Sequence, residues 1–167
     1  MEKHIKNDKK SSKLVILGKL PTKYNCPYLD NKTWEKWSMG MHKDMSVISQ
    51  YVDKWFDLHI TPENDNDDTV KLKDFPLKEL EDMVGGQYFN NISAILIAYA
   101  VYLGYTHIYL AGMQFIDDTE GYHKRQKQYN NVREMIFFAR GRGLTIECYD
   151  DIILKEYNHG ENEDYDG

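Results

Sequence analysis

Several polar residues of this 167-residue chain stand at the ends of predicted strands and helices, where a side chain can reach a ligand. His59 comes at the end of the alternating run "DKWFDLHI". A histidine in that position can bind phosphate or act as a general base, and a partly exposed structural histidine is the alternative. No set of nucleophile, histidine and carboxylate follows from the spacing, so the pattern offers a base without a clear partner.

A second polar cluster precedes the most apolar stretch of the chain, "NNISAILIAYAVYLG". Asn90, Asn91 and Ser93 place amides, a hydroxyl and free backbone N–H groups at the start of a predicted helix. That end of a helix carries partial positive charge and suits a phosphate or carboxylate. Simple capping is the alternative. Two asparagines and a serine are more than one cap requires, which favours an anion site.

Three glycines each follow a predicted strand: Gly18 in "VILGKLPT", Gly40 in "WEKWSMG" and Gly112 in "THIYLAG". Glycine in this place lets a ligand approach the backbone closely, although turn geometry alone explains it equally well. Thr22, in the loop after the first strand, belongs to the same candidate site. The chain has neither G-x-G-x-x-G nor G-x-x-x-x-G-K-[ST], so it lacks the dinucleotide fingerprint and the P-loop.

The segment after the third of these glycines supplies further candidates. Gln114, Tyr122 and His123 are expected to face the ligand. Asp117 and Asp118 could hold a metal or the hydroxyls of a ribose, and solvated loop carboxylates are the alternative. No further carboxylate is clearly placed to complete a magnesium site, and the two cysteines fit no metal spacing. The sequence therefore predicts a site without a metal or a separate cofactor.

The elements that must position these residues alternate between strand and helix patterns. Short β-branched or alternating runs predict strands at 13–18, 34–40, 53–60, 106–112 and 143–149. Apolar residues at helical spacing predict helices at 44–52, 75–86, 90–104 and 150–157, and one that follows a polar loop within 117–143. The segments 19–33 and 61–69 are predicted as loops.

This alternation predicts an α/β, Rossmann-like three-layer sandwich with a mainly parallel sheet. In such sheets the ligand binds at the carboxyl ends of the strands, near the switch in strand order. Gly18, Gly40, His59 and Gly112 all fall at predicted strand ends. The pattern thus locates a site without saying what happens there.

Composition and charge exclude several classes of function. Lys and Arg total 21 against 27 Asp and Glu, a net charge of −6, which argues against nucleic acid as the partner. The helix at 90–104 is too short to span a bilayer, so no membrane association is expected. The charged start of the chain indicates no secretory signal, and two cysteines outside any disulfide framework point to the cytoplasm.

The length favours one domain with a full hydrophobic core. We expect that domain at residues 13–158, between a flexible N-terminal segment, 1–12, and an acidic flexible tail, 159–167. Because small α/β domains often assemble symmetrically, a homo-oligomer is expected.

Taken together, "VILGKLPT", "WEKWSMG", "KWFDLH", "FPLKELEDMVGGQYFNNISAILIAYAVYLGYTHIYLAG" and "NVREMIFFARGRGLTIE" resemble a family of short phage-encoded Rossmann-like proteins. The stretch 88–115 also looks like the core of bacterial sialyltransferases and of the archaeal hydroxymethylpterin pyrophosphokinase group. The resemblance implies a nucleotide or nucleotide-sugar at this end of the sheet. It carries over to Gly18 and to Asn90, Asn91 and Ser93. Gln114 stands where the phage relatives often have an aspartate, which argues against carboxylate chemistry there.

Three functions are compatible with these observations. The first is a binding module for a nucleotide-derived small molecule: a nucleotide, a nucleotide-sugar or a signal of the cyclic-nucleotide type. For a phage protein in the host cytoplasm, this predicts sequestration of that molecule from host defence. The second is a small transferase that moves a sugar or phosphoryl group, with His59 or His123 as base. The third is a partner-binding protein that kept the fold and lost the site. The lack of a clear acid–base pair favours binding without turnover.

Overall fold

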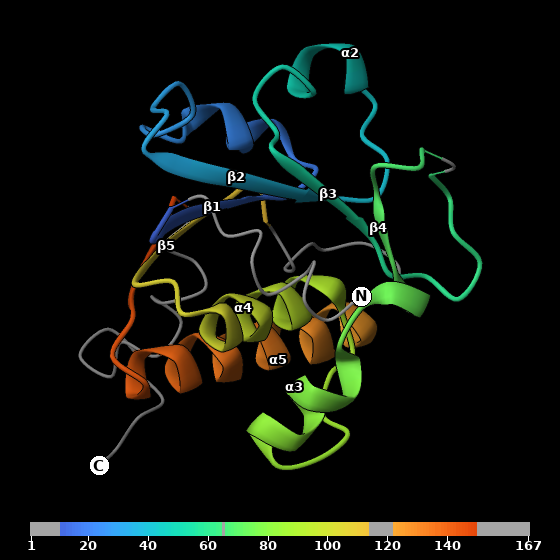
Figure 1. Cartoon of the computed structure of the whole chain (residues 1–167), viewed down its shortest axis with the longest axis vertical. Helices are drawn as coiled ribbons and strands as arrows, with labels where there is room; N and C mark the ends of the chain where they lie inside the picture. The colour runs from blue at the N-terminus through green and yellow to red at the C-terminus, as the bar shows by residue number, and fades with distance from the viewer. Residues whose placement is uncertain (1–10, 65, 114–121, 150–167) are drawn as a thin grey trace.

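The computed structural model describes residues 11–64, 66–113 and 122–149, and it contains a six-stranded sheet (Figure 1). The strands are β1 (Lys13–Leu17), β2 (Trp34–Met39), β3 (Lys54–Asp57), β4 (Val70–Lys71), β5 (His107–Ala111) and β6 (Thr145–Cys148). They lie in the order β4-β3-β2-β1-β5-β6, and each neighbouring pair is parallel. The predicted α/β, Rossmann-like class is confirmed, with a sheet that is parallel throughout.

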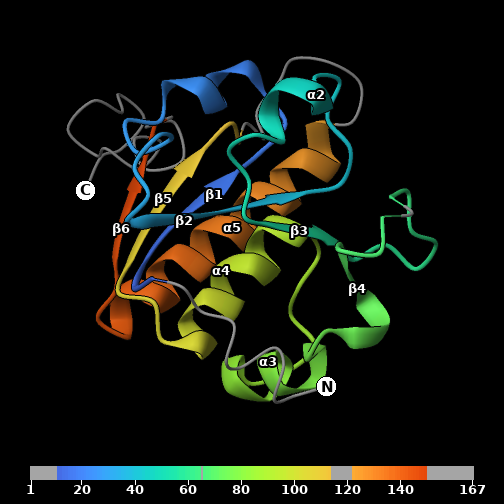
Figure 2. The same cartoon turned by 45° about the horizontal axis from the view of Figure 1, so that its top comes forward.

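Helical segments cover both faces of this sheet (Figures 1 and 2). One face carries α3 (Leu77–Val84), α4 (Ile92–Leu103) and α5 (Tyr122–Gly141). The other carries the 3₁₀ helix η1 (Pro21–Asn25) and α2 (Met45–Ile48). A further 3₁₀ turn, η2 (Leu72–Asp74), follows β4. The result is the expected arrangement of three layers.

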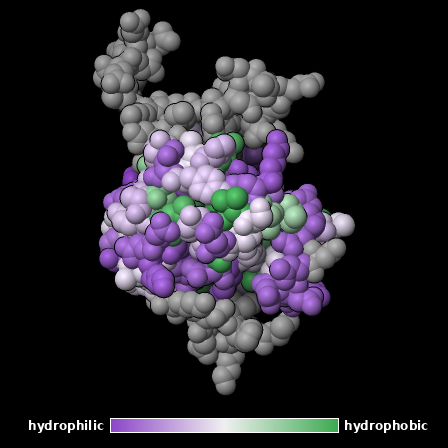
Figure 3. All heavy atoms as spheres, turned by 90° about the horizontal axis from the view of Figure 1, so that it is seen from above, coloured by the Kyte–Doolittle hydropathy of each residue, from purple (hydrophilic) through white to green (hydrophobic). Residues whose placement is uncertain are grey.

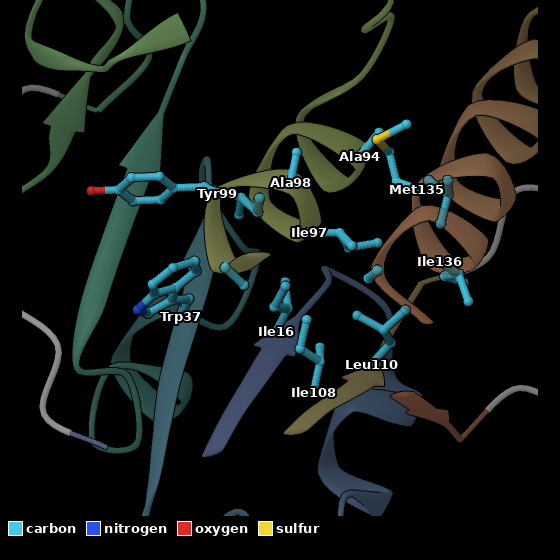
Figure 4. Packing of buried hydrophobic residues seen from close by; sticks show 14 of the residues in the cluster. Ile16, Trp37, Ala94, Ile97, Ala98, Tyr99, Ile108, Leu110, Met135 and Ile136 are labelled. Carbon is cyan, nitrogen blue, oxygen red and sulfur yellow. The ribbon is translucent and has the colours of Figure 1, made fainter. Parts of the chain in front are cut away.

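The strand β1 shows why the central strands read as continuous apolar runs. Successive residues of a strand point to opposite faces of the sheet. Leu14 and Ile16 therefore pack in the large core under α4 and α5, whereas Val15 and Leu17 pack in the smaller core under η1 and α2. Figure 4 shows the first of these cores, where strand residues such as Ile16 meet the side chains of α4 and α5. A strand that is buried on both faces has no polar side to alternate with.

The central helix α4 packs on the sheet next to α3 and α5 and is apolar on nearly every side. Asn91 caps its start, because the Asn91 side chain accepts a hydrogen bond of 3.0 Å from the backbone N–H of Ala94. Gly104 ends it with a φ of 90°, a left-handed conformation that favours glycine. The helix predicted at 90–104 is confirmed. Among the residues that the structure describes, none of the helices combines the length and the hydrophobicity that a transmembrane span requires.

Other predicted elements differ from the structure in detail. The loop predicted at 19–33 contains η1, and the helix predicted at 44–52 shortens to the four residues of α2. The two-residue strand β4 follows the predicted acidic loop 61–69 and has no pattern of its own. The strand β3 ends at Asp57, so His59 lies two residues beyond it. The closing helix predicted at 150–157 lies outside the described residues.

Candidate functional site

The strand order reverses between β1 and β5. From β1 the chain adds β2, β3 and β4 on one side, then crosses back to β5 and adds β6 on the other. The carboxyl ends of β1 and β5 are therefore the topological switch point of the sheet, where ligands of open α/β folds bind. Gly18 follows β1 and Gly112 follows β5, so two predicted site residues flank this point.

The backbones at Gly18 and Gly112 lie very close together. A Cβ built at Gly18 would lie 2.3 Å from the carbonyl oxygen of Gly112, and one built at Gly112 would lie 2.8 Å from Cβ of Lys23. The Gly18 N–H donates to the carbonyl of Ala111 at 2.7 Å, and the Leu20 N–H donates to that of Gly112 at 3.1 Å. Both glycines are thus required by the close approach of two backbones. That requirement accounts for them without a ligand, and ligand contact at either stays a prediction.

The third predicted glycine, Gly40, lies at the end of β2 and has an exposed cation next to it. Its φ is 62°, and its N–H donates to the carbonyl of Phe56 at 2.9 Å. A Cβ at Gly40 would lie 3.0 Å from Nζ of Lys19, so the exposed Lys19 side chain reaches from the end of β1 over the end of β2. The edge therefore presents an exposed positive charge close to the backbone of Gly40, a pairing that suits an anion.

Beneath this cation lies a polar network that the sequence did not reveal. Lys23 is only 1 % exposed, and its Nζ donates to Asp44 Oδ1 at 2.8 Å and to His42 Nδ1 at 2.8 Å. His42 Nε2 lies 2.8 Å from Ser38 Oγ, and that hydroxyl donates to the carbonyl of Leu17 at 2.7 Å. Because an ammonium can only donate, these partners assign the imidazole proton to Nε2.

The charges of this network follow from its burial and its hydrogen bonds. Burial and the nearby Lys23 ammonium lower the pKa of His42 from 6.5 to about 4, so the ring is neutral at pH 7. Hydrogen bonds from Lys23 and Tyr24 lower the pKa of Asp44 to about 2. Burial, together with the hydrogen bond to Asp44, raises the pKa of Tyr24 to about 12. The network thus holds one cation, one anion and two neutral rings, and it ties η1 to the segment after β2.

The start of α4 reaches the same edge of the sheet. The Ser93 hydroxyl is buried and lies 3.6 Å from Sδ of Met39, the last residue of β2. The asparagine side chains bind other protein groups: Asn90 Nδ2 donates to the carbonyl of Lys127, and Asn91 Nδ2 donates to that of Gln128. Asn91 therefore caps α4, and both asparagines attach the start of this helix to α5. Within the part of the chain that the structure describes, the N–H groups of Ile92 and Ser93 keep no partner.

Another predicted residue, His59, is held by a buried carboxylate two residues before it. His59 Nδ1 lies 2.7 Å from Oδ1 of Asp57, which is fully buried, whereas the His59 side chain is 51 % exposed. Burial raises the pKa of Asp57, but hydrogen bonds from the Asn64 N–H, His59 and the Glu63 N–H outweigh it, so the net pKa is lowered. An ionised carboxylate next to Nδ1 leaves Nε2 of His59 as the nitrogen available to a substrate.

For the remaining predicted residues, the structure gives the helix in which they lie or does not describe them. Thr22 lies in η1, and its Oγ1 is buried without a hydrogen-bond partner among the described residues. Tyr122 and His123 lie in the first turn of α5. Gln114 and the pair Asp117 and Asp118 lie outside the described residues. No group of His, Cys, Asp and Glu in the described ranges could hold a metal ion.

The surface over η1 and α2 is mainly hydrophilic, with only small hydrophobic areas (Figure 3). Exposed apolar side chains occur there singly, at Met41, at Val47 and, after β3, at Ile60. Single exposed apolar residues of this kind are normal on a protein surface.

No protein-family model and no curated protein matches the chain. Two solved structures are similar to it in fold. One is a variant of the α-2,3/8-sialyltransferase CstII, with 16 % identity, 84 % of this chain and 82 % of that chain covered, and a TM-score of 0.47. The other is the α-2,3-sialyltransferase from Campylobacter jejuni in apo form, with 16 % identity, 88 % and 79 % covered, and a TM-score of 0.48. The similarity concerns the arrangement of helices and strands.

Proposed function

We propose that the chain binds a nucleotide-derived small molecule at the carboxyl edge of its sheet. The observation that carries this proposal is the position of Lys19: it is exposed, starts at the switch point after β1 and lies over Gly40 at the end of β2. A phosphate at this edge would meet the Lys19 ammonium and the N–H groups of Ile92 and Ser93, which have no partner among the described residues.

Two further features support an anionic ligand here. The buried Thr22 hydroxyl has no partner among the described residues, and a buried donor without one is a cost that a ligand would relieve. The Lys23 network fixes η1 against the segment after β2, so the edge is pre-organised before a ligand arrives. Sequestration of that ligand, a phage origin and a homo-oligomer stay predictions from the sequence.

The test begins with the purified full chain. Small molecules released by denaturing it are identified by mass spectrometry, and nucleoside mono- and diphosphates are titrated calorimetrically. Replacing Lys19 with Gln should weaken binding about tenfold, because it removes one charge-assisted hydrogen bond. Lys78→Gln, which removes an exposed lysine on α3, is the matched control and should leave the affinity unchanged. If no nucleotide binds and none is released, the proposal is wrong.

A transferase is the second candidate, and the pair Asp57 and His59 favours it. A buried, ionised carboxylate that orients a half-exposed imidazole is the arrangement of a general base and its positioning partner. Strand spacing puts β3 roughly 10 Å from β1, a distance that a nucleotide-sugar can bridge. Asp57 also holds the loop after β3 through the Glu63 and Asn64 N–H groups, which is a sufficient structural role.

Turnover separates the two functions. Incubation with nucleotide-sugars and a range of acceptors should give no transfer if the chain is only a binding module. If transfer occurs, His59→Gln should abolish it while leaving nucleotide affinity within about twofold, because this base acts on the acceptor rather than on the phosphate. Transfer that survives this substitution would exclude His59 as the base.

A further inference from the structure

A cavity of about 320 Å³ lies at the opposite, amino edge of the sheet. Its lining includes Lys13, Trp34, His107 and Thr145, which are the first residues of β1, β2, β5 and β6. These residues are register partners in neighbouring strands, so their side chains share one face. The volume is at the lower end of the range for small-molecule sites. This amino-edge cavity is separate from the carboxyl-edge site proposed above.

One side of the cavity offers hydrogen-bond donors. Lys13 of β1 places its ammonium 5.7 Å from the centre of the Trp34 ring. Within the described ranges no carboxylate lies within ion-pair distance of that ammonium. Asn31 accepts with its Oδ1 from the N–H and the hydroxyl of Thr33, at 2.9 and 2.7 Å, which leaves its amide nitrogen as a donor.

The other side offers acceptors. Thr106 Oγ1 donates to the carbonyl of Ser12 at 3.1 Å, so it can only accept from His107 Nδ1, which lies 2.9 Å away. In a neutral His107 ring, Nε2 then carries the lone pair. Glu147 of β6 is exposed, and no cation of the described residues pairs with it. The cavity therefore has a cation on the β1 side and an anion on the β6 side that do not neutralise each other.

We propose that the amino-edge cavity binds a small zwitterion of the amino-acid type. The carboxylate of such a molecule would lie beside Lys13 and the Asn31 amide, and its ammonium beside Glu147 and Nε2 of His107. The edge of the Trp34 ring, which lies 6.3 Å from the His107 ring between centroids, would contact the ligand body. A ligand with one charge would leave the opposite wall unpaired, and an apolar ligand would leave both walls unpaired.

The experiment uses the full chain labelled with ¹⁵N, at pH 7.5. The twenty common free L-amino acids are titrated, first as a mixture and then singly, while backbone amide shifts are followed. Binding should shift the amides of Lys13, His107 and Glu147 and leave those around Lys19 and Gly40 unchanged. N-acetylation of the bound amino acid, or conversion of its carboxylate to an amide, should each weaken binding at least tenfold, because each removes one charge.

Substitutions then test the two walls. Lys13→Gln and Glu147→Gln should each weaken binding about tenfold, whereas Glu134→Gln, an exposed substitution on α5, should have no effect. The unchanged spectrum of each free variant verifies its fold. The proposal is overturned if no amino acid at millimolar concentration shifts these amides, if the acetylated or amidated forms bind equally well, or if both wall variants bind normally. None of these outcomes bears on the nucleotide site, which is tested by Lys19→Gln.

Discussion

The buried imidazole of His42 makes the stability of the chain depend on pH. His42 is 5 % exposed and neutral in the folded protein, where burial and Lys23 lower its pKa to about 4. In the unfolded chain the ring titrates near 6.5. Between these values the unfolded state binds the extra proton, so the free energy of unfolding must fall as the pH falls from 6.5 toward 4.

The size of this effect follows from the two pKa values. The difference between 6.5 and about 4, at roughly 1.4 kcal/mol per pH unit, corresponds to about 3 kcal/mol. Asp44 acts in a separate window. Its carboxyl has a pKa of about 2 in the folded chain against 3.8 ordinarily, so its contribution is present above pH 3.8 and is lost below it. A loss between pH 6.5 and 4 therefore reports on the histidine.

The perturbation is His42→Gln, which removes the titration and keeps the hydrogen bonds. Glutamine can accept from Lys23 through its side-chain oxygen and donate to Ser38 through its amide, as the neutral ring does. Urea unfolding, followed by circular dichroism at several pH values from 7.5 to 4, gives the free energy of each variant. The wild-type chain should lose about 3 kcal/mol more than His42→Gln over this range. Parallel curves for the two proteins would refute the lowered pKa of His42.

Three further substitutions test the backbone approach at Gly18, the cap of α4 and the carboxylate at the end of β3. Gly18→Ala places a Cβ 2.3 Å from the Gly112 carbonyl oxygen and should lower the free energy of unfolding in urea by about 1–3 kcal/mol. The control Gly141→Ala meets nothing within 4 Å and should not lower it. Equal effects of the two substitutions would contradict the close approach of the backbones at Gly18 and Gly112. Asn91→Ala removes the cap of α4 and should cost about 1 kcal/mol in the same assay, and an unchanged midpoint would contradict that role. Asp57→Asn replaces a buried carboxylate that accepts from backbone N–H groups, and it should lower the free energy of unfolding by about 2–4 kcal/mol above pH 4. Amide exchange at Glu63 and Asn64 should become faster. Unchanged exchange at these two amides would contradict the role of Asp57 in holding this loop.

The parts of the fold that the sequence predicts are those with strong local signals. β1 and β5 are apolar runs closed by glycine, and α4 has both its Asn91 cap and its Gly104 end in the sequence. The stripe on α5 is equally local, since Val132, Met135, Ile136 and Ala139 are all buried as their spacing requires. By contrast, β4 has two residues and exists because β3 offers an open edge, so no periodicity could reveal it.

The sequence predicted where in the fold the candidate residues lie, but not which side chains they contact. Parallel strands bring their carboxyl ends to one edge, which is why Gly18, Gly40 and Gly112 lie there. The Lys23 network depends on contacts between residues that are distant in the chain. Lys23 lies 21 positions from Asp44 and 19 positions from His42. A lysine among turn residues ordinarily predicts a solvated side chain. The nearest signal was the run "HKD" at 42–44, a histidine and an aspartate directly after a strand and its glycine.

The burial of Lys23 is better explained by position than by stability. Taking an ammonium out of water costs several kcal/mol, and an ion pair with the partly exposed Asp44 returns only part of that. What the lysine does achieve is geometric: its stem packs on Gly112 after β5, and its ammonium reaches His42 and Asp44 after β2. One side chain thus spans the switch point and fixes two loops that would otherwise move independently. A nonpolar residue of similar length could fill the space, but it could not hold the neutral imidazole or set the path of the backbone beside Gly40.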